Sequence, residues 1–163
     1  MKESVFYPQA DLLVQTLPFV HAEECFALKG GTAINFFVRD FPRLSVDIDL
    51  VYLPVEERAV TLRGIDAALR RIAEKIRRAL PNVQVREQKP SGENLVVKLT
   101  LRGPRGADVK VEPNSERPAA RYGAAERSEF GFEFDYYREP AGRSGKLEIL
   151  YLSRIPCSRE KFS

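Results

Sequence analysis

The sequence predicts one domain of the mixed α/β (α+β) class, with a central mixed sheet flanked by helices. Short runs in which apolar and polar residues alternate, the pattern of a strand, recur along the chain. Between them lie stretches with apolar residues three and four apart, the pattern of a helix. With 163 residues, 44% of them hydrophobic and 30% charged, the chain has the size and composition of a globular domain with a real core.

The first elements are expected to be a helix, a strand and a second helix. Residues 7–17 begin an apolar helical pattern that Pro18 limits, because proline lacks the N–H that a helix interior needs. Residues 25–29 contain a short apolar run that predicts a strand, and residues 33–38 are mostly apolar at helical spacing. Gly30-Gly31 therefore lies at a strand-to-helix corner.

Further along, alternation predicts strands at residues 45–53, 83–88, 95–102 and 107–113. Residues 104–106 form a tight turn, which makes the last two strands an antiparallel pair. Residues 113–125 and 140–145 are expected to be loops. A long helix is expected over residues 56–80 from its apolar stripe, which consists of Leu62, Ile65, Leu69, Ile72, Ile76 and Leu80.

The opposite face of this long helix is basic. Such a face can lie along a nucleic-acid backbone. A solvated surface with ion pairs inside the helix is the alternative, and it is the usual case for such a face. Its basic residues are Arg58, Arg63, Arg70, Arg71, Lys75, Arg77 and Arg78.

The glycine corner has the features of a phosphate site. Gly30 and Gly31 lack a Cβ, so the backbone there can take positive φ and let a ligand approach its amides. The following helix begins with unpaired N–H groups and a positive dipole end, and Thr32 can cap it or turn its hydroxyl toward the same anion. A plain glycine turn is the structural alternative for so short a motif.

Two acids lie on one face of the strand that follows. Ser45, Asp47 and Asp49 alternate with apolar residues and therefore project the same way. Carboxylates at i and i+2 are about 7 Å apart at Cα, a spacing at which they can share hard cations such as Mg²⁺. A solvated strand face with two scattered acids is the alternative, although aspartate is a poor strand former.

A third acid is expected from residues 107–113. Asp108, Lys110 and Glu112 occupy the polar face of this strand. Glu112 is the candidate to complete a metal site and to take a proton from an attacking hydroxyl, with Asp108 as the competing choice. Lys110 can meet a phosphate or neutralise the acids.

Three runs in the chain resemble the nucleotidyltransferase toxins of the AbiE type (AbiEii), members of the DNA polymerase beta-like superfamily. They are residues 26–33 (Phe-Ala-Leu-Lys-Gly-Gly-Thr-Ala), 43–50 (Arg-Leu-Ser-Val-Asp-Ile-Asp-Leu) and 109–112 (Val-Lys-Val-Glu). The resemblance implies a triphosphate-binding turn at Gly30, Gly31 and Thr32, with Arg43 and Ser45 beside it, a metal-binding pair at Asp47 and Asp49, and a third-strand pair at Lys110 and Glu112. It also favours Glu112 over Asp108.

The resemblance further implies an activity. Such toxins belong to bacterial type IV toxin–antitoxin and phage-exclusion systems, so the chain is expected to be a Mg²⁺-dependent (or Mn²⁺-dependent) nucleotidyltransferase that moves a nucleoside monophosphate from an NTP to a hydroxyl. The implied acceptor is RNA, with the 3′ end of tRNA as a plausible target, and the implied partner is an antitoxin protein.

The resemblance covers about the first 115 residues of the single domain, 1–163. Residues 116–163 form an atypical tail without the helical half that family members usually carry, so a short member, a truncated product or a fragment is expected. Two alternatives follow: a nucleotide-binding protein without turnover, and a remnant that serves as a protein-binding module.

Composition and charge bear on the cellular location of the chain and on its binding partners. The N-terminus has no basic region followed by a long apolar run, and no segment reaches about 18 apolar residues, so neither secretion nor membrane insertion is expected and the cytoplasm is predicted. Cys25 and Cys157 have no metal-ligand spacing, and His21 is expected at a helix end on the surface. The net charge of +3 is compatible with an RNA or nucleotide partner.

Overall fold

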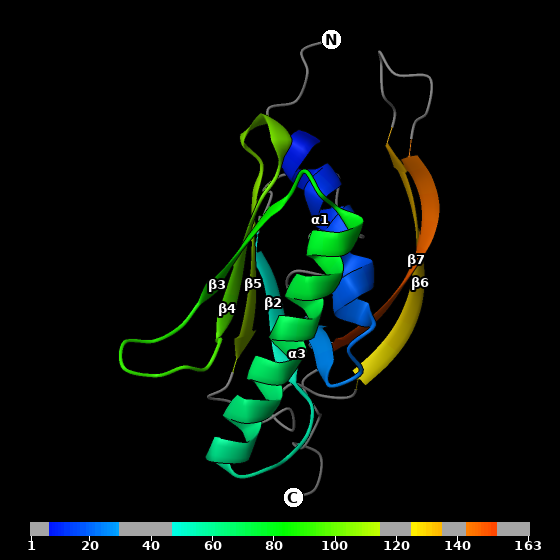
Figure 1. The fold of residues 1–163 in the computed structure, drawn as a ribbon. Coiled ribbons are helices and arrows are strands. Elements are labelled where there is room, and N and C mark those ends of the chain that lie inside the picture. The colour runs from blue at the N-terminus through cyan, green and yellow to red at the C-terminus, as the bar shows by residue number, and fades with distance from the viewer. Residues whose placement is uncertain (1–6, 30–46, 115–124, 135–142, 153–163) are drawn as a thin grey trace, which may run out of the picture.

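The computed structural model describes residues 7–29, 47–114, 125–134 and 143–152, the last two ranges for the backbone alone. The described elements, in chain order, are α1 (Tyr7–His21), β1 (Phe26–Lys29), β2 (Asp47–Tyr52), α3 (Arg58–Ala79), β3 (Gln84–Gln88), β4 (Lys98–Arg102), the 3-10 turn η1 (Pro104–Gly106), β5 (Asp108–Asn114), β6 (Ala125–Phe134) and β7 (Arg143–Leu152) (Figure 1).

In the described ranges the strands form a seven-stranded sheet in the order β3-β4-β5-β2-β1-β7-β6. Neighbouring strands are antiparallel except for two parallel pairs, β2 with β5 and β1 with β7. The mixed sheet of an α+β domain is therefore confirmed. The long helix and the antiparallel strands β3 and β4 lie in the chain between the parallel neighbours β2 and β5.

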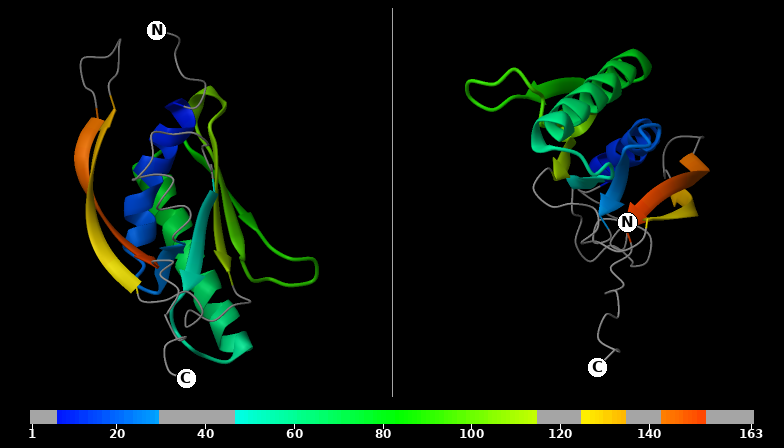
Figure 2. Two further views of the ribbon diagram at one scale, coloured as in Figure 1. Left: turned by 180° about the vertical axis from the view of Figure 1, so that it is seen from behind. Right: turned by 90° about the horizontal axis from the view of Figure 1, so that it is seen from below.

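Both described helices cover the same face of the sheet. α1 contacts β1, β5 and β7, and α3 contacts β3, β4 and α1. Figure 2 shows the two helices on one side, with the sheet curving around them. Every second residue of the central strands is buried beneath them; examples are Ile48, Leu50, Leu99, Leu101, Val109 and Val111, each at most 1% exposed. The intervening polar residues therefore belong to the opposite face.

Helix α1 does not end where its proline predicts. It continues through Pro18 to His21, and the Pro18 carbonyl accepts a hydrogen bond from the Ala22 N–H at 3.1 Å. Leu17 and Val20, on either side of the proline, are only 3% and 4% exposed. Burial of such side chains contributes about 1.5–3 kcal/mol each, which is comparable to the roughly 3 kcal/mol that an interior proline costs.

Other predicted boundaries move as well. α3, β1 and β3 lie one or two residues inside their predicted ranges. β7 begins at Arg143, inside the predicted loop 140–145, because Arg143 pairs with Phe134 in the β6–β7 ladder. β4 begins at Lys98 rather than at residue 95, because the Val96 N–H is bound by the Asp66 carboxylate of α3 at 2.7 Å. β5 extends one residue beyond the predicted strand, to Asn114, into the predicted loop 113–125. The predicted helix 33–38 lies outside the described residues.

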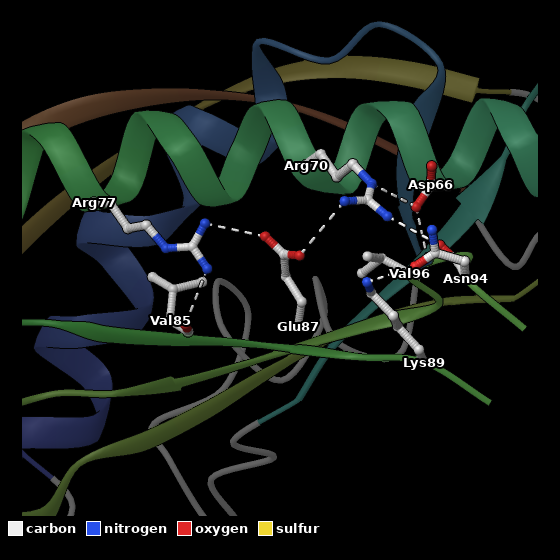
Figure 3. A network of polar contacts seen from close by, with 8 residues as sticks. All are labelled: Asp66, Arg70, Arg77, Val85, Glu87, Lys89, Asn94 and Val96. Atoms are coloured by element: carbon white, nitrogen blue, oxygen red, sulfur yellow. Dashed lines mark hydrogen bonds and ion pairs between the residues drawn. The ribbon is translucent and has the colours of Figure 1, made fainter. Parts of the chain in front are cut away.

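Ion pairs attach α3 to the neighbouring strands (Figure 3). Arg70 contacts both Asp66 and Glu87, and Arg77 contacts Glu87 and donates to the Val85 carbonyl. On the other side of the helix, Arg71 and Lys75 contact Glu23. Arg78 pairs with Glu74 within the helix. Much of the basic face of α3 is thus engaged in ion pairs. Two of them, Arg70–Asp66 and Arg78–Glu74, lie within the helix as the structural alternative predicted, and the others join the helix to β3 and to Glu23.

None of the described helices combines the length and apolar character needed to cross a membrane.

Candidate functional site

The polar face of β2 carries two aspartates. Asp47 and Asp49 are half-buried, whereas Ile48 and Leu50 between and beyond them are 0% and 1% exposed. The alternation therefore places both carboxylates on the face of the sheet away from the helices. Val51, the next residue of this face, is fully buried, so the aspartates lie at the polar end of the strand.

β5 brings a third carboxylate to the same face. It runs parallel to β2, with Glu112 in register with Asp49 and Lys110 in register with Asp47. Neighbouring strands are about 4.8 Å apart, so Glu112 is the cross-strand neighbour of Asp49. Asp108 lies four residues before Glu112 on this strand, in register with Arg102, and its carboxylate binds that arginine at 3.0 Å.

Two lysines flank these acids. The Lys98 ammonium group forms an ion pair with the Glu112 carboxylate. Lys29 follows Leu28, which pairs with Leu50, so the antiparallel register brings Lys29 to Asp49. One row across four strands therefore has two acids in its middle and a cation at each end. In order along the row, these residues are Lys29, Asp49, Glu112 and Lys98.

The sequence pattern assigns no role to Lys29. For Lys98 it allows a contact with substrate but favours a surface lysine. A signal for Lys98 exists nevertheless. Lys98 and Glu112 lie equally far from Arg105, the middle residue of the turn that joins their strands. A symmetric antiparallel hairpin places such residues opposite each other.

The electrostatics of Asp49 reflect this crowding. Burial raises its pKa above the ordinary value of 3.8, and the negative charges of Glu112 and Asp47 raise it further. Lys29 and Lys98 act in the opposite direction, but the net shift of the pKa is upward. Ionised Asp49 thus has an unfavourable environment that an additional cation would relieve.

The donor set suits a hard divalent cation. Asp47, Asp49 and Glu112 offer only carboxylate oxygens, the ligands that Mg²⁺ and Mn²⁺ prefer. Within residues 7–29 and 47–114, no three acidic, histidine or cysteine side chains are gathered as a ready metal cluster, and Glu112 contacts Lys98 instead. The chemistry of the residues fits such an ion, while the described arrangement has a lysine in contact with the third acid.

The predicted triphosphate-binding residues lie outside the described part of the chain. They are Gly30, Gly31, Thr32, Arg43 and Ser45, which fall between the end of β1 and the start of β2. Lys110 is described: it is exposed on β5, on the same face as the acids.

Cys25 is a free thiol whose pKa is raised by burial and by the nearby Glu23 charge.

A family model described as nucleotidyl transferase AbiEii toxin, Type IV TA system, matches residues 11–151. That match includes β6 and all but the last residue of β7, and it extends beyond the first 115 residues that carry the sequence motifs. No curated protein matches the sequence.

Two solved structures show a distant similarity. Terminal uridylyl transferase 4 from Trypanosoma brucei with bound dUTP aligns at a TM-score of 0.38 and 16% identity, over 67% of this chain and 39% of that chain. JHP933 from Helicobacter pylori aligns at a TM-score of 0.38 and 14% identity, over 76% of this chain and 50% of that one. The chain thus spans half or less of each of these proteins. Because the family model covers most of its length, the chain belongs to the AbiEii family of nucleotidyl transferase toxins of type IV toxin–antitoxin systems.

Proposed function

We propose that this chain transfers a nucleoside monophosphate from an NTP to a hydroxyl group of an RNA and releases pyrophosphate. The observation that carries the proposal is the parallel register of β2 and β5, which sets Glu112 beside Asp49 on the face that also bears Asp47. Membership of a nucleotidyl transferase family supports the reaction class.

The proposed roles follow from the chemistry of each residue. Asp47, Asp49 and Glu112 would hold Mg²⁺ or Mn²⁺. When bound, the ion would orient the triphosphate and neutralise charge on the departing pyrophosphate. Lys110 would contact a phosphate from the exposed end of the same face. Gly30, Gly31, Thr32, Arg43 and Ser45 would complete the triphosphate site.

Bond changes in this reaction are simple. The acceptor hydroxyl oxygen bonds to the α-phosphorus, and the bond from that phosphorus to the oxygen bridging it to the β-phosphorus breaks. The hydroxyl proton passes to a carboxylate, for which Glu112 is the proposed base. Lys98 contacts this carboxylate, so it is placed to balance the charge of Glu112 before the proton arrives.

The acceptor and partner are proposed from the family. An RNA, with the 3′ end of tRNA as the target, would receive the nucleotide, and an antitoxin protein would control the activity in the cytoplasm. The polar face of the sheet described above would be the surface from which both substrates are reached.

The test combines the purified chain with Mg²⁺, total RNA and each labelled NTP in turn. We expect a labelled RNA product with the native sequence, and a loss of at least about 100-fold in Asp47→Ala/Asp49→Ala, because several kcal/mol of charge stabilisation disappear. The matched control is Glu24→Ala/Glu93→Ala, which removes the same charge from exposed sites.

Three results would contradict the proposal. Mg²⁺-dependent NTP binding without any labelled product would indicate a nucleotide-binding protein without turnover. Absence of any measurable binding of Mg-NTP by the native chain would indicate a protein-binding module. An unchanged affinity in the double-aspartate variant would refute the metal site.

A further inference from the structure

The polar face continues from the acids to the edge of the sheet. In successive strands, Asp47 is in register with Lys110, Lys110 with Thr100, and Thr100 with Arg86. This row crosses β2, β5, β4 and β3, and at about 4.8 Å per strand it spans about 14 Å. A polymer whose end lies at the acids could therefore follow the row outward.

We define the open-face strip as the residues of β3 and β4 on this face together with the exposed lysine of β5. Its members are Gln84, Arg86, Gln88, Lys98, Thr100, Arg102 and Lys110. They hold four basic side chains and no carboxylate. The acid of β3, Glu87, belongs to the other face and contacts α3 (Figure 3).

Two of the basic groups on the strip form no ion pair with a described side chain. Lys98 and Arg102 contact Glu112 and Asp108. Arg86 and Lys110 are exposed, and neither has an ion-pair partner among the described side chains. They lie in the same row as Asp47, two strands apart from each other. The strip is thus a positive surface that leads away from the acids.

The other basic surface of the described chain is less suited to an anion. On α3, the arginines and the lysine of the last three turns already contact carboxylates; they are Arg70, Arg71, Lys75, Arg77 and Arg78. A polyanion would have to displace these acids, whereas Arg86 and Lys110 need no such exchange. Arg58 and Arg63, in the first two turns of α3, are exposed and outside these ion pairs, but they lie on the helix side of the sheet. Arg86 and Lys110 lie on the other side, with the candidate site.

The chemistry of the strip favours a nucleic acid over a protein. Interfaces between proteins bury a core rich in apolar and aromatic side chains, and the strip has none. Nucleic-acid interfaces are more polar and more positive. Gln84, Gln88 and Thr100 add hydrogen-bonding groups between the cations, and Gln88 already donates to Thr100 at 3.0 Å.

From this charge, register and polarity we propose that the open-face strip binds the sugar–phosphate backbone of the RNA acceptor, upstream of the reacting hydroxyl. This rests on the proposed transfer to RNA. Arg86 would contact a backbone phosphate several nucleotides from the end that reaches Asp47 and Asp49, and it would fix the strand's direction along the row.

The test measures binding of a fluorescein-labelled transfer RNA pool to the full chain without NTP, at several salt concentrations. Arg86→Glu should raise the Kd by roughly five- to tenfold and reduce the slope of log Kd against log salt by about 0.7 for each phosphate of a single strand that is no longer neutralised. Arg63→Glu is the matched control: it makes the same charge change at an exposed site on α3 and should leave the affinity within about twofold.

A second variant tests whether Arg86→Glu weakens binding only through local unfolding of the edge strand. Gln84→Glu adds a carboxylate on the same face of β3 without removing the arginine, and it should also weaken binding. In the transfer reaction, both strip variants should raise KM for RNA and leave kcat and KM for NTP nearly unchanged.

The outcomes separate the two proposals. If the native chain transfers nucleotides but Arg86→Glu matches Arg63→Glu in both RNA affinity and KM, the strip is refuted and the reaction stands. If transfer is absent but RNA binding still falls selectively in the strip variants, the surface stands and the reaction fails. Weaker binding of a purified protein partner with unchanged RNA affinity in Arg86→Glu would overturn the assignment to RNA.

Discussion

At the residue scale, Asp49 shows how neighbours determine the behaviour of one carboxyl group. Burial and two acids raise its pKa, while two lysines oppose the shift without cancelling it. The sheet places all four charged neighbours close to Asp49. Asp47 lies on the same strand and Glu112 is the register partner of Asp49, while Lys29 and Lys98 lie at the two ends of the row. The ionised form of Asp49 is therefore disfavoured by its surroundings.

We predict that Asp49→Asn stabilises the metal-free chain at neutral pH. A carboxyl whose pKa is raised on folding contributes its full stability below the unfolded value of 3.8, and that contribution is lost as pH rises through the folded pKa. The gain from the amide should therefore disappear in acid. Urea unfolding of both proteins across this pH range measures it.

Glu93→Gln provides the control for that experiment, because Glu93 is exposed and its removal changes the net charge equally. A destabilised Asp49→Asn at neutral pH would mean that the two lysines outweigh burial and the neighbouring acids. The same raised pKa also predicts that Mn²⁺ affinity of the native chain falls as pH falls through the folded value, since a metal competes with the proton for this carboxylate.

At the element scale, the packing of α3 on β2 depends on a glycine. Gly64 lies against Tyr52, and an added Cβ would be 2.9 Å from Cζ of the ring and nearer still to its hydroxyl. Tyr52 is 9% exposed, stacks edge-on with Phe26 at 5.9 Å and donates to Glu56 at 3.3 Å. The helix therefore approaches the strand at a point where no larger residue fits.

We predict that Gly64→Ala destabilises the chain by about 1–3 kcal/mol through overpacking, although alanine favours a helix interior by about 1 kcal/mol. Thermal or urea unfolding gives the sign. In a Tyr52→Leu background, where the ring is absent, the same substitution should become neutral or stabilising. Equal effects in both backgrounds would show that the ring is not the cause.

Helices and strands were predicted correctly from local sequence patterns, but their ends were predicted wrongly where a contact with another part of the chain sets the end. The period-two alternation of β2 and β5 and the apolar stripe of α3 were read correctly, because each depends on residues close together in the chain. The start of β4 was wrong because Asp66, thirty residues away, binds the Val96 N–H. The end of α1 was wrong because burial of its last turn outweighs the proline.

At the scale of the whole molecule, a continuous core unites α1, α3 and the central strands. Ile72 lies in its middle and is fully buried. Outside the core, Arg71 donates three hydrogen bonds of 2.8 to 3.1 Å to the buried carboxylate of Glu23, and they connect α3 to the turn between α1 and β1. Helices and sheet are therefore expected to unfold together.

We predict that Ile72→Ala lowers the free energy of unfolding by about 2–5 kcal/mol, the transfer and cavity cost of a buried isoleucine. Val55→Ala, at a position that is 82% exposed, should change it by less than about 0.5 kcal/mol. Urea unfolding followed by circular dichroism provides both values. A small effect at Ile72 would mean that the core collapses around the missing atoms.

The sequence by itself determined which residues share a strand face and which reaction class the motifs resemble. Both are short-range properties: alternation sets the face, and motif spacing lies within a few residues. Only the tertiary structure decided that Glu112 lies beside Asp49, that Lys29 flanks the pair, and that Arg86 continues the row from Asp47. The reason is physical: strand order, burial and the charges around an acid depend on residues far apart in the chain, which no local pattern records.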